Sequence, residues 1–310
     1  MSDTDTRPHI VVIVGPTAVG KTDCAIRLSQ EFYGEIINAD SMQVYKGMDV
    51  GTAKPDANQQ KIVRFHLIDV VEPDQTFSAG AFAVKAKQTI SDILQRRKVP
   101  IVCGGTGLYC KALLSGIVRT PRADYGYRAK LESMEDAALG ALYQMLADLD
   151  PDRARELKKR DKLRIIRALE ILHLTGTKMS ELTSSHGFRD ISYSSIKIGL
   201  FLPKSELEQN IRVRVDKMFA KGWIEEVIKL REIGYDSGLP SMKALGYSQI
   251  SDLIEGKISL EEAKEKIVST TKKYAKRQFT WFKADHDIAW YKYPDDYEKI
   301  NQICKTFLLK

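Results

Sequence analysis

GPTAVGKT, residues 15–22, lies between an apolar run, His9–Val14, and residues 23–32, whose apolar side chains recur at helical spacing. The short β-branched run predicts a buried parallel strand, and the spacing after the loop predicts a helix. A glycine loop between a strand and a helix is the setting in which G-x-x-x-x-G-K-[ST] binds phosphate, because the loop amides and the helix N-terminus face an anion. We therefore expect a di- or triphosphate to bind here, rather than a simple glycine turn.

Every residue of this loop is a candidate ligand for a diphosphate or a nucleotide: Gly15, Pro16, Thr17, Ala18, Val19, Gly20, Lys21 and Thr22. Lys21 adds a positive charge, and Thr22 supplies a hydroxyl suited to Mg²⁺. The loop leaves the reaction open. A kinase transfers the terminal phosphoryl group, an NTPase hydrolyses it, and a third class of enzyme uses diphosphate as a leaving group.

The composition is that of an ordinary globular protein, with 43% of the 310 residues hydrophobic and 29% charged. The formal net charge of +7 allows a polyanionic partner. The four cysteines show no C-x-x-C spacing, which argues against a zinc site or a disulfide framework. The polar N-terminus carries no apolar signal segment, and no run approaches the roughly 20 apolar residues that span a bilayer. We expect a cytoplasmic monomer with no membrane partner.

The pattern of predicted strands and helices changes twice along the chain. Strand and helix patterns alternate up to about residue 117, the strand pattern is missing from about 121 to 195, and it returns at residues 195–202. The earlier strands are expected at His9–Val14, Glu35–Ala39, Phe65–Val70 and Val99–Cys103. Alternation of this kind predicts an α/β fold with a parallel sheet. We expect a P-loop NTPase-like core of residues 1–120 and 196–310, interrupted by a helical insertion domain of residues 121–195.

Two polar patterns follow predicted strands. Asp40 ends the second strand, within NADSMQVYKGMDVGTAKP (38–55), and GGTGLY (104–109) follows the fourth. Because ligands bind beyond the carboxyl ends of parallel strands, both patterns are expected on the rim that carries the phosphate loop. The Asp40 carboxylate is suited to holding Mg²⁺ through water or to accepting a proton. Closing a turn through its own backbone is an equally good interpretation of Asp40. The three glycines of GGTG allow close approach to a ligand, with the Thr106 hydroxyl among them.

Basic residues are concentrated in RARELKKRDKLRIIR (153–167) and KKYAKRQFTWFK (272–283). For either run alone, a solvated helix face is the more common explanation. The second run interleaves aromatic rings with cations, a mixture that binds a phosphate backbone or packs the edge of a core. In the first run, Arg164 and Arg167 share a helix face, which suits a clamp on substrate phosphates or on a nucleic-acid backbone. Composition does not separate these alternatives.

Taken together and in order, the motifs resemble the tRNA dimethylallyltransferases, also called isopentenyl-tRNA transferases, of the bacterial type. The matching segments are GPTAVGKT (15–22), DSMQVYKGMDVGTAKP (40–55), HLID (66–69), GGTGLY (104–109), DKLRIIRALE (161–170), RVDKMFAKGWIEEV (214–227), ALGYSQ (244–249) and YAKRQFTWF (274–282). The chain departs from the family pattern at Phe65, Ala81, Lys46 and Lys272, where histidine, an acidic residue and two arginines are usual.

The resemblance implies transfer of a dimethylallyl group from dimethylallyl diphosphate to N6 of the adenine 3′-adjacent to the anticodon, with release of diphosphate. It implies that the loop binds the diphosphate with Mg²⁺ at Thr22, and that Asp40, as general base, acts with Thr106 and Arg128 as the catalytic residues. The helical insertion would then close over the anticodon stem-loop. The implied tRNA-binding residues are Asp40, Ser41, Met42, Gln43, Leu163, Arg164, Ile165, Ile166, Arg167, Lys243, Gly246 and Tyr247.

Three other functions compete with this interpretation. A small-molecule kinase would share the phosphate loop, but it would give no reason for DSMQVY or for two basic helices. A non-catalytic RNA-binding module would have no need of Asp40. An adenylate isopentenyltransferase would share the donor but modify free AMP, and the long basic insertion favours tRNA over AMP as the acceptor.

Overall fold

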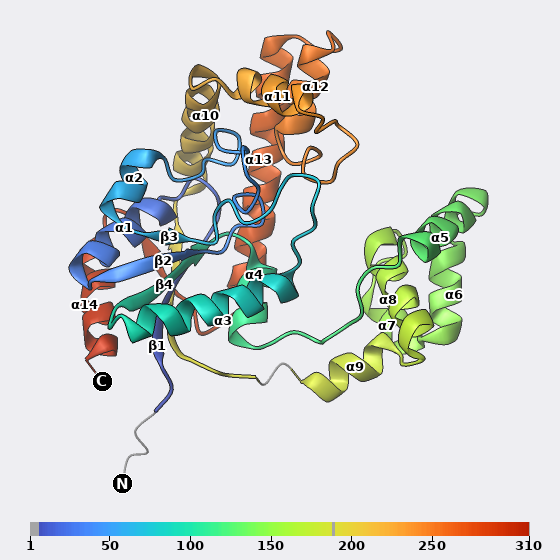
Figure 1. Ribbon diagram of the computed structural model, residues 1–310, viewed down its shortest axis with the longest axis horizontal. Coiled ribbons are helices and arrows are strands. Elements are labelled where there is room, and N and C mark those ends of the chain that lie inside the picture. Colours follow the sequence, from blue (N-terminus) through green and yellow to red (C-terminus); the bar gives the residue numbers. More distant parts are fainter. Residues whose placement is uncertain (1–5, 188–189, 310) are drawn as a thin grey trace. The chain divides into compact units, whose positions relative to one another are not determined.

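A computed structural model describes residues 6–187 and 190–309 of the chain. The chain forms two compact units, one of residues 1–114 and 191–310 and one of residues 115–190. The first unit is larger and contains the sheet, while the second is helical (Figure 1). The boundaries expected from the sequence were 121 and 195. Within the described residues, no helix is long and apolar enough to cross a membrane.

The larger unit is built on a six-stranded sheet in the order β3-β2-β4-β1-β5-β6, and every neighbouring pair is parallel. The strands are β1 (His9–Val14), β2 (Gly34–Asn38), β3 (Phe65–His66), β4 (Val99–Gly104), β5 (Ser194–Phe201) and β6 (Ala289–Lys292). The structure thus confirms the α/β fold and its parallel sheet. It also adds β6, which the sequence pattern did not indicate.

The predicted strand Phe65–Val70 is wrong in length, since β3 ends at His66. Leu67 and Asp69 have positive φ angles of 60° and 54°, a left-handed conformation that cannot continue a strand. The chain therefore turns away from the sheet edge directly after β3.

Helices cover both faces of this sheet. Val11 and Ile13 of β1 pack in one core with helix α1 (Lys21–Glu31) and helix α14 (Tyr297–Leu308). The alternate residues of β1 are also buried and face the other side, because side chains alternate along a strand. Helices α3 (Ala79–Gln95) and α4 (Gly107–Leu114) lie together near that part of the sheet (Figure 1).

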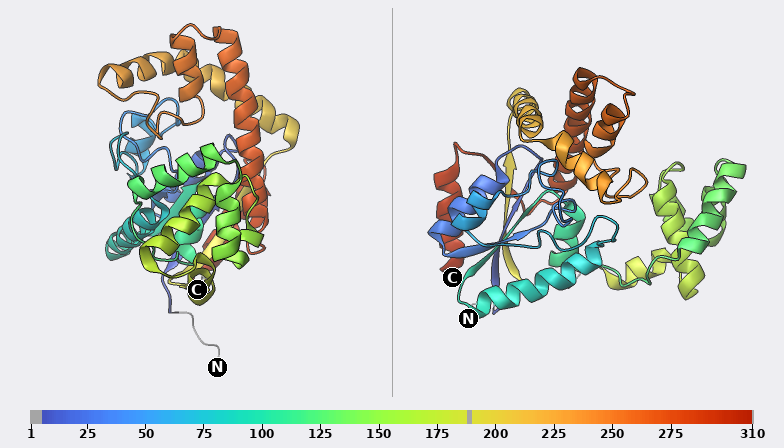
Figure 2. Two further views of the ribbon diagram at one scale, coloured as in Figure 1. Left: turned by 90° about the vertical axis from the view of Figure 1, so that its right-hand side faces the viewer. Right: turned by 45° about the horizontal axis from the view of Figure 1, so that its top comes forward.

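A second core in the same unit lies beyond the carboxyl ends of the strands. It joins the loop after β2 to helices that come from the C-terminal third of the chain, grouped in both views of Figure 2. Those helices are α10 (Lys204–Ala220), α11 (Trp223–Glu232), α12 (Tyr247–Ile254) and α13 (Leu260–Lys283), and the short α2 (Ala57–Ile62) follows the loop. This core brings residues near 45 and residues near 270 into one structure above the sheet.

The smaller unit consists of α5 (Tyr125–Ala137), α6 (Ala141–Leu149), α7 (Pro151–Glu156), α8 (Lys162–Thr175) and α9 (Met179–His186). Leucines of α5 and α6 pack against Ile165, Ile166 and Leu169 of α8. The unit therefore has its own hydrophobic core, as expected for a helical insertion with leucines and isoleucines at helical spacing.

Candidate active site

The phosphate loop has the conformation that its glycines permit. Gly15 has a φ of 143°, and a Cβ atom there would lie 2.4 Å from the carbonyl oxygen of Leu200 in β5. Helix α1 begins at Lys21, directly after Gly20, which is in the left-handed conformation. The loop amides and the start of α1 thus lie next to one another at the end of β1, the arrangement that favours an anion.

Lys21 is folded back over its own loop, and its Nζ donates a hydrogen bond to the carbonyl oxygen of Pro16 at 2.6 Å. Burial lowers the pKa of Lys21 from 10.5 to about 8, because the ammonium group loses its water. A bound diphosphate would supply the missing negative charge, so the protonated lysine and the anion should stabilise each other.

This coupling predicts a pH dependence of donor binding. The affinity for diphosphate should fall as the pH rises through about 8, approaching tenfold per pH unit, because the complex requires a protonated Lys21. Isothermal titration between pH 7 and pH 10 measures this effect. The Lys21→Arg variant is the control, since a guanidinium stays protonated and should flatten the profile. A flat profile in the unmodified protein would contradict the prediction.

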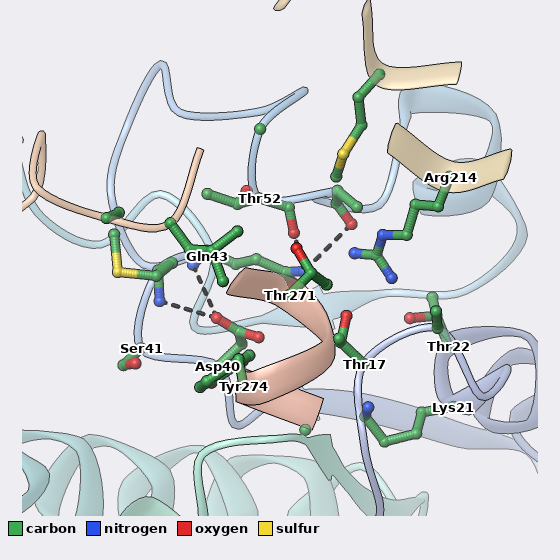
Figure 3. Close-up of a pocket in the computed structure, with 18 of the residues that line it drawn as sticks. Thr17, Lys21, Thr22, Asp40, Ser41, Gln43, Thr52, Arg214, Thr271 and Tyr274 are labelled. Atoms are coloured by element: carbon green, nitrogen blue, oxygen red, sulfur yellow. Dashed lines mark hydrogen bonds between the residues drawn. The ribbon is translucent and has the colours of Figure 1, made fainter. Parts of the chain in front are cut away.

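Arg214 is the second cation of the site, and sequence analysis attached no role to it. It lies in α10 among the buried residues Ile211, Val215 and Met218. Within the described part of the chain, its guanidinium has no hydrogen-bond or ion-pair partner, and burial lowers its pKa. Figure 3 shows the guanidinium pointing into the pocket on the side of Thr22. A single arginine within an apolar helical stripe was the signal that could have identified it.

Asp40 lies two residues after the end of β2, and one of its carboxylate oxygens closes a turn. Oδ1 accepts hydrogen bonds from the backbone amides of Met42 at 2.8 Å and Gln43 at 3.4 Å. No described residue donates to Oδ2, and the side chain lines the pocket (Figure 3). The two interpretations of Asp40 are therefore compatible, because the turn orients the carboxylate and leaves one oxygen available to a ligand.

Thr106 joins the end of β4 to the residues beside Asp40. Its Oγ1 accepts a hydrogen bond from the Ser41 amide at 2.9 Å and lies 3.2 Å from the Ser41 hydroxyl oxygen, with which it forms a second hydrogen bond. The Thr106 amide donates to the carbonyl oxygen of Ala39 at 3.1 Å. The two polar patterns that the sequence placed at strand ends are thus in direct contact.

Other residues that the resemblance assigned to tRNA binding also lie around the loop after β2. Gln43 is buried, and its Nε2 donates to the carbonyl oxygens of Thr52 and Ala53. Met42 packs against the second core. Tyr247 is buried and its hydroxyl donates to Glu226, while Lys243 lines the pocket and Gly246 immediately precedes α12. The side chains of Met42, Gln43, Lys243 and Tyr247 form part of the pocket wall.

One cavity of about 680 Å³ brings Lys21, Arg214 and Asp40 together. It is lined by the phosphate loop, Asp40, the loop after β2, and the facing surfaces of α10 and α13. At one end lie Lys21, Thr22 and Arg214, and Asp40 and Ser41 lie away from them (Figure 3). Apolar side chains of α10 line the same cavity. An anion and an apolar group can therefore bind side by side within reach of a carboxylate.

Two of the predicted arginines of the helical unit, Arg128 and Arg167, bind one buried carboxylate. Arg128 makes two hydrogen bonds to Glu170, at 2.7 and 2.8 Å, and Arg167 binds the same carboxylate together with the Thr120 hydroxyl. Burial raises the pKa of Glu170, but the hydrogen bonds from both arginines outweigh it and lower the pKa to about 2. Arg128 and Arg167 therefore stabilise the unit, whatever else they contact.

The remaining predicted residues of α8 divide by exposure. Leu163 is 81% exposed, and Arg164 is exposed and paired with Asp161, whereas Ile165 and Ile166 are 2% and 3% exposed. Their isoleucine side chains belong to the core of the helical unit. Lys158, Lys159 and Arg160, in the turn before α8, are exposed cations that the sequence did not single out beyond their basic run.

Glu170→Ala should therefore destabilise the helical unit by about 3 kcal/mol, because it leaves two partly buried guanidinium groups without their carboxylate. This stabilisation should be complete above about pH 4.5 and should be lost as the pH falls towards 2. Amide hydrogen exchange of α5 and α8 in the full chain measures it. Asp152→Ala, which removes an exposed pair with Arg155, should change protection by less than about 1 kcal/mol. Equal losses in both variants would contradict the prediction.

The chain matches the family model described as IPP transferase over residues 43–285. It is 43% identical to a tRNA dimethylallyltransferase of Geobacter sulfurreducens over 304 residues, which is 97% of each chain. It is 44% identical to a tRNA dimethylallyltransferase 2 of Geotalea uraniireducens, over 99% of this chain and all of that protein.

Solved structures agree with these relatives. A tRNA isopentenylpyrophosphate transferase of Bacillus halodurans has a TM-score of 0.72, with 35% identity over 98% of this chain and 97% of its own. A eukaryotic dimethylallyltransferase solved acting on tRNA has a TM-score of 0.77, with 29% identity over 91% of this chain and 73% of its own. The family model, the relatives and the solved structures agree, and the chain belongs to the IPP transferase family, as its motifs predicted.

Proposed function

We propose that this chain transfers a dimethylallyl group from dimethylallyl diphosphate to N6 of the adenine 3′-adjacent to the anticodon in tRNA. The observation that carries the proposal is a single cavity that holds a carboxylate and, away from it, two cations, of which Arg214 has no partner among the described residues. The relatives named tRNA dimethylallyltransferase support the same reaction and acceptor.

The donor diphosphate would bind between the phosphate loop and Arg214. The loop amides, Lys21 and the guanidinium together offset its charge, and they stabilise the charge that grows on the leaving oxygen. Thr22 lies beside Lys21 in the cavity wall, and the described residues contain no cluster of acidic, histidine or cysteine side chains that would hold a metal by itself. This arrangement fits Mg²⁺, which binds few protein ligands and is held mainly by substrate phosphates. Thr22 would hold the ion, which would supply further charge neutralisation.

The transfer itself breaks the bond between the allylic carbon and the diphosphate oxygen and forms a bond from that carbon to N6. Diphosphate leaves with the bonding electrons, and the N6 proton passes to the free oxygen of Asp40. The apolar side chains of α10 give the five-carbon group a dry surface, which limits attack by water on the same carbon.

The acceptor adenine would enter the cavity as a single unstacked nucleotide, because a duplex or a stacked loop does not fit within about 680 Å³. The anticodon stem-loop would remain outside the cavity, and exposed cations of the helical unit such as Lys158 and Lys159 suit binding to phosphates. Backbone contacts position the RNA, while the cavity selects the base.

Labelled dimethylallyl diphosphate and Mg²⁺, offered in parallel with unmodified tRNA, AMP and ATP, test the proposal. Label should enter the adenine next to the anticodon, and AMP should be a far poorer acceptor because it lacks the phosphate contacts. Equal labelling of AMP would assign the chain to the adenylate class. Stoichiometric release of phosphate from ATP would favour the kinase.

A further inference from the structure

Gln278 of α13 connects two loops of the cavity through a single side chain. Its Nε2 donates to the carbonyl oxygen of Gly105 at 2.9 Å, and its Oε1 accepts from the amide of Thr17 at 2.8 Å. The side chain is 6% exposed. Both ends of the amide are therefore used, in a place where an unmade hydrogen bond would be costly.

Any side chain at Gly105 would require the end of the Gln278 side chain to move. A Cβ atom at this position would lie 2.1 Å from the Nε2 of Gln278. A side chain there would push the glutamine amide off the carbonyl oxygen that it binds. The glycine of GGTG and the glutamine of KRQFTWF are thus a matched pair, although 173 positions separate them.

In the proposed reaction, one of these loops binds the donor and the other lies next to the acceptor site. Thr17 is part of the phosphate loop, which holds the donor. Gly105 precedes Thr106, whose hydroxyl binds Ser41 next to Asp40, the acceptor side. A rigid link between these loops would therefore set the distance of the allylic carbon from N6 and from the general base Asp40.

We propose that Gln278 is a positioning residue, which holds the donor loop and the acceptor turn at the separation that the transfer requires. This inference rests on the proposed function. It gives a role to one residue of the 274–282 motif, in which the sequence pattern indicated only a mixture of cations and aromatic rings. It also explains why the residue is neutral, because a carboxylate cannot donate a hydrogen bond to the Gly105 carbonyl oxygen.

Gln278→Met keeps the length and volume of the side chain and removes both hydrogen bonds. We expect the single-turnover rate of transfer to fall about 10²-fold, because a displacement of about 1 Å between reacting groups costs that much. The affinities for tRNA and for dimethylallyl diphosphate should change by less than about threefold. Thr106→Val removes the next link towards Asp40, and the double variant should be no slower than the slower single variant.

Ser29→Ala is the matched control, since it removes a hydrogen bond of a buried side chain in α1 that does not line the cavity. It should leave the rate unchanged, whatever its effect on the melting temperature. Multiplying losses in the double variant, or a rate that follows the melting temperature, would overturn the positioning role. If Gln278→Met does not fold, Gln278→Leu, an uncharged side chain that also makes neither hydrogen bond, takes its place in the same cycle.

Unmodified protein is assayed beside the variants. If it transfers no label to tRNA, the proposed function fails. If it does so and Gln278→Met is equally fast, the reaction stands and only the positioning role fails.

Discussion

Asp40→Asn is expected to lower the single-turnover rate of transfer by about 10²–10⁴-fold, the usual cost of losing a general base. Asparagine keeps the oxygen that accepts from the Met42 amide, so the turn after β2 should survive. It loses the negative oxygen that would take the N6 proton. The affinity for tRNA and for dimethylallyl diphosphate should stay close to that of the unmodified protein, since their phosphates bind elsewhere.

The competing explanation, in which Asp40 only closes a turn, makes a different prediction. It requires a lower melting temperature and weaker binding in proportion to the lost rate. Melting temperature, tRNA affinity and single-turnover rate, measured on one preparation, separate the two. Asp92→Asn, a partly exposed position in α3 outside the cavity, serves as the reference substitution. Normal chemistry in a stably folded Asp40→Asn protein would remove the general base from the mechanism.

Arg214→Met should have two opposite effects. Donor binding should weaken by about 2–5 kcal/mol, about 30-fold or more, because the diphosphate loses a desolvated cation. The free protein should melt at a higher temperature, because methionine continues the apolar stripe of Ile211, Val215 and Met218 and removes a guanidinium that has no partner among the described residues. Titration calorimetry and thermal melting without ligand measure the two effects.

Arg212→Met is the matched control for this pair of effects. Arg212 lies two residues away on the same helix, but it is exposed and paired with Glu265. Its loss should change neither donor affinity nor melting temperature by much. A structural role for Arg214 would instead give a lower melting temperature, with donor affinity retained.

The sequence predicted those parts of the fold whose causes are local. The apolar runs of β1, β2, β4 and β5 and the glycine loop before α1 need only their own residues to be recognised. The strand of four residues at Ala289–Lys292 escaped because it is too short to show a period. The predicted length of β3 was wrong because the left-handed backbone conformation after His66 does not change the pattern of hydrophobic residues.

In the helical unit, the sequence identified arginines but not their partners. Arg128 and Glu170 are 42 positions apart and come together only when α5 packs on α8. Ile165 and Ile166 lie in the same motif as Arg164 and Arg167, yet their side chains form the core of the unit. A motif shows which residues belong together, and the packing of the helix determines which of them face outwards.

The sequence by itself determined the phosphate loop, the parallel sheet, the position of Asp40 at a strand end and the family. Each depends on neighbouring residues or on an ordered series of motifs. The tertiary structure alone decided that Arg214 lines the pocket with no partner among the described residues, that Thr106 binds Ser41, and that Gln278 joins Thr17 to Gly105. These relations link residues 65 to 261 positions apart. No local pattern encodes such contacts, because they exist only after the second core has brought α10 and α13 over the ends of the strands.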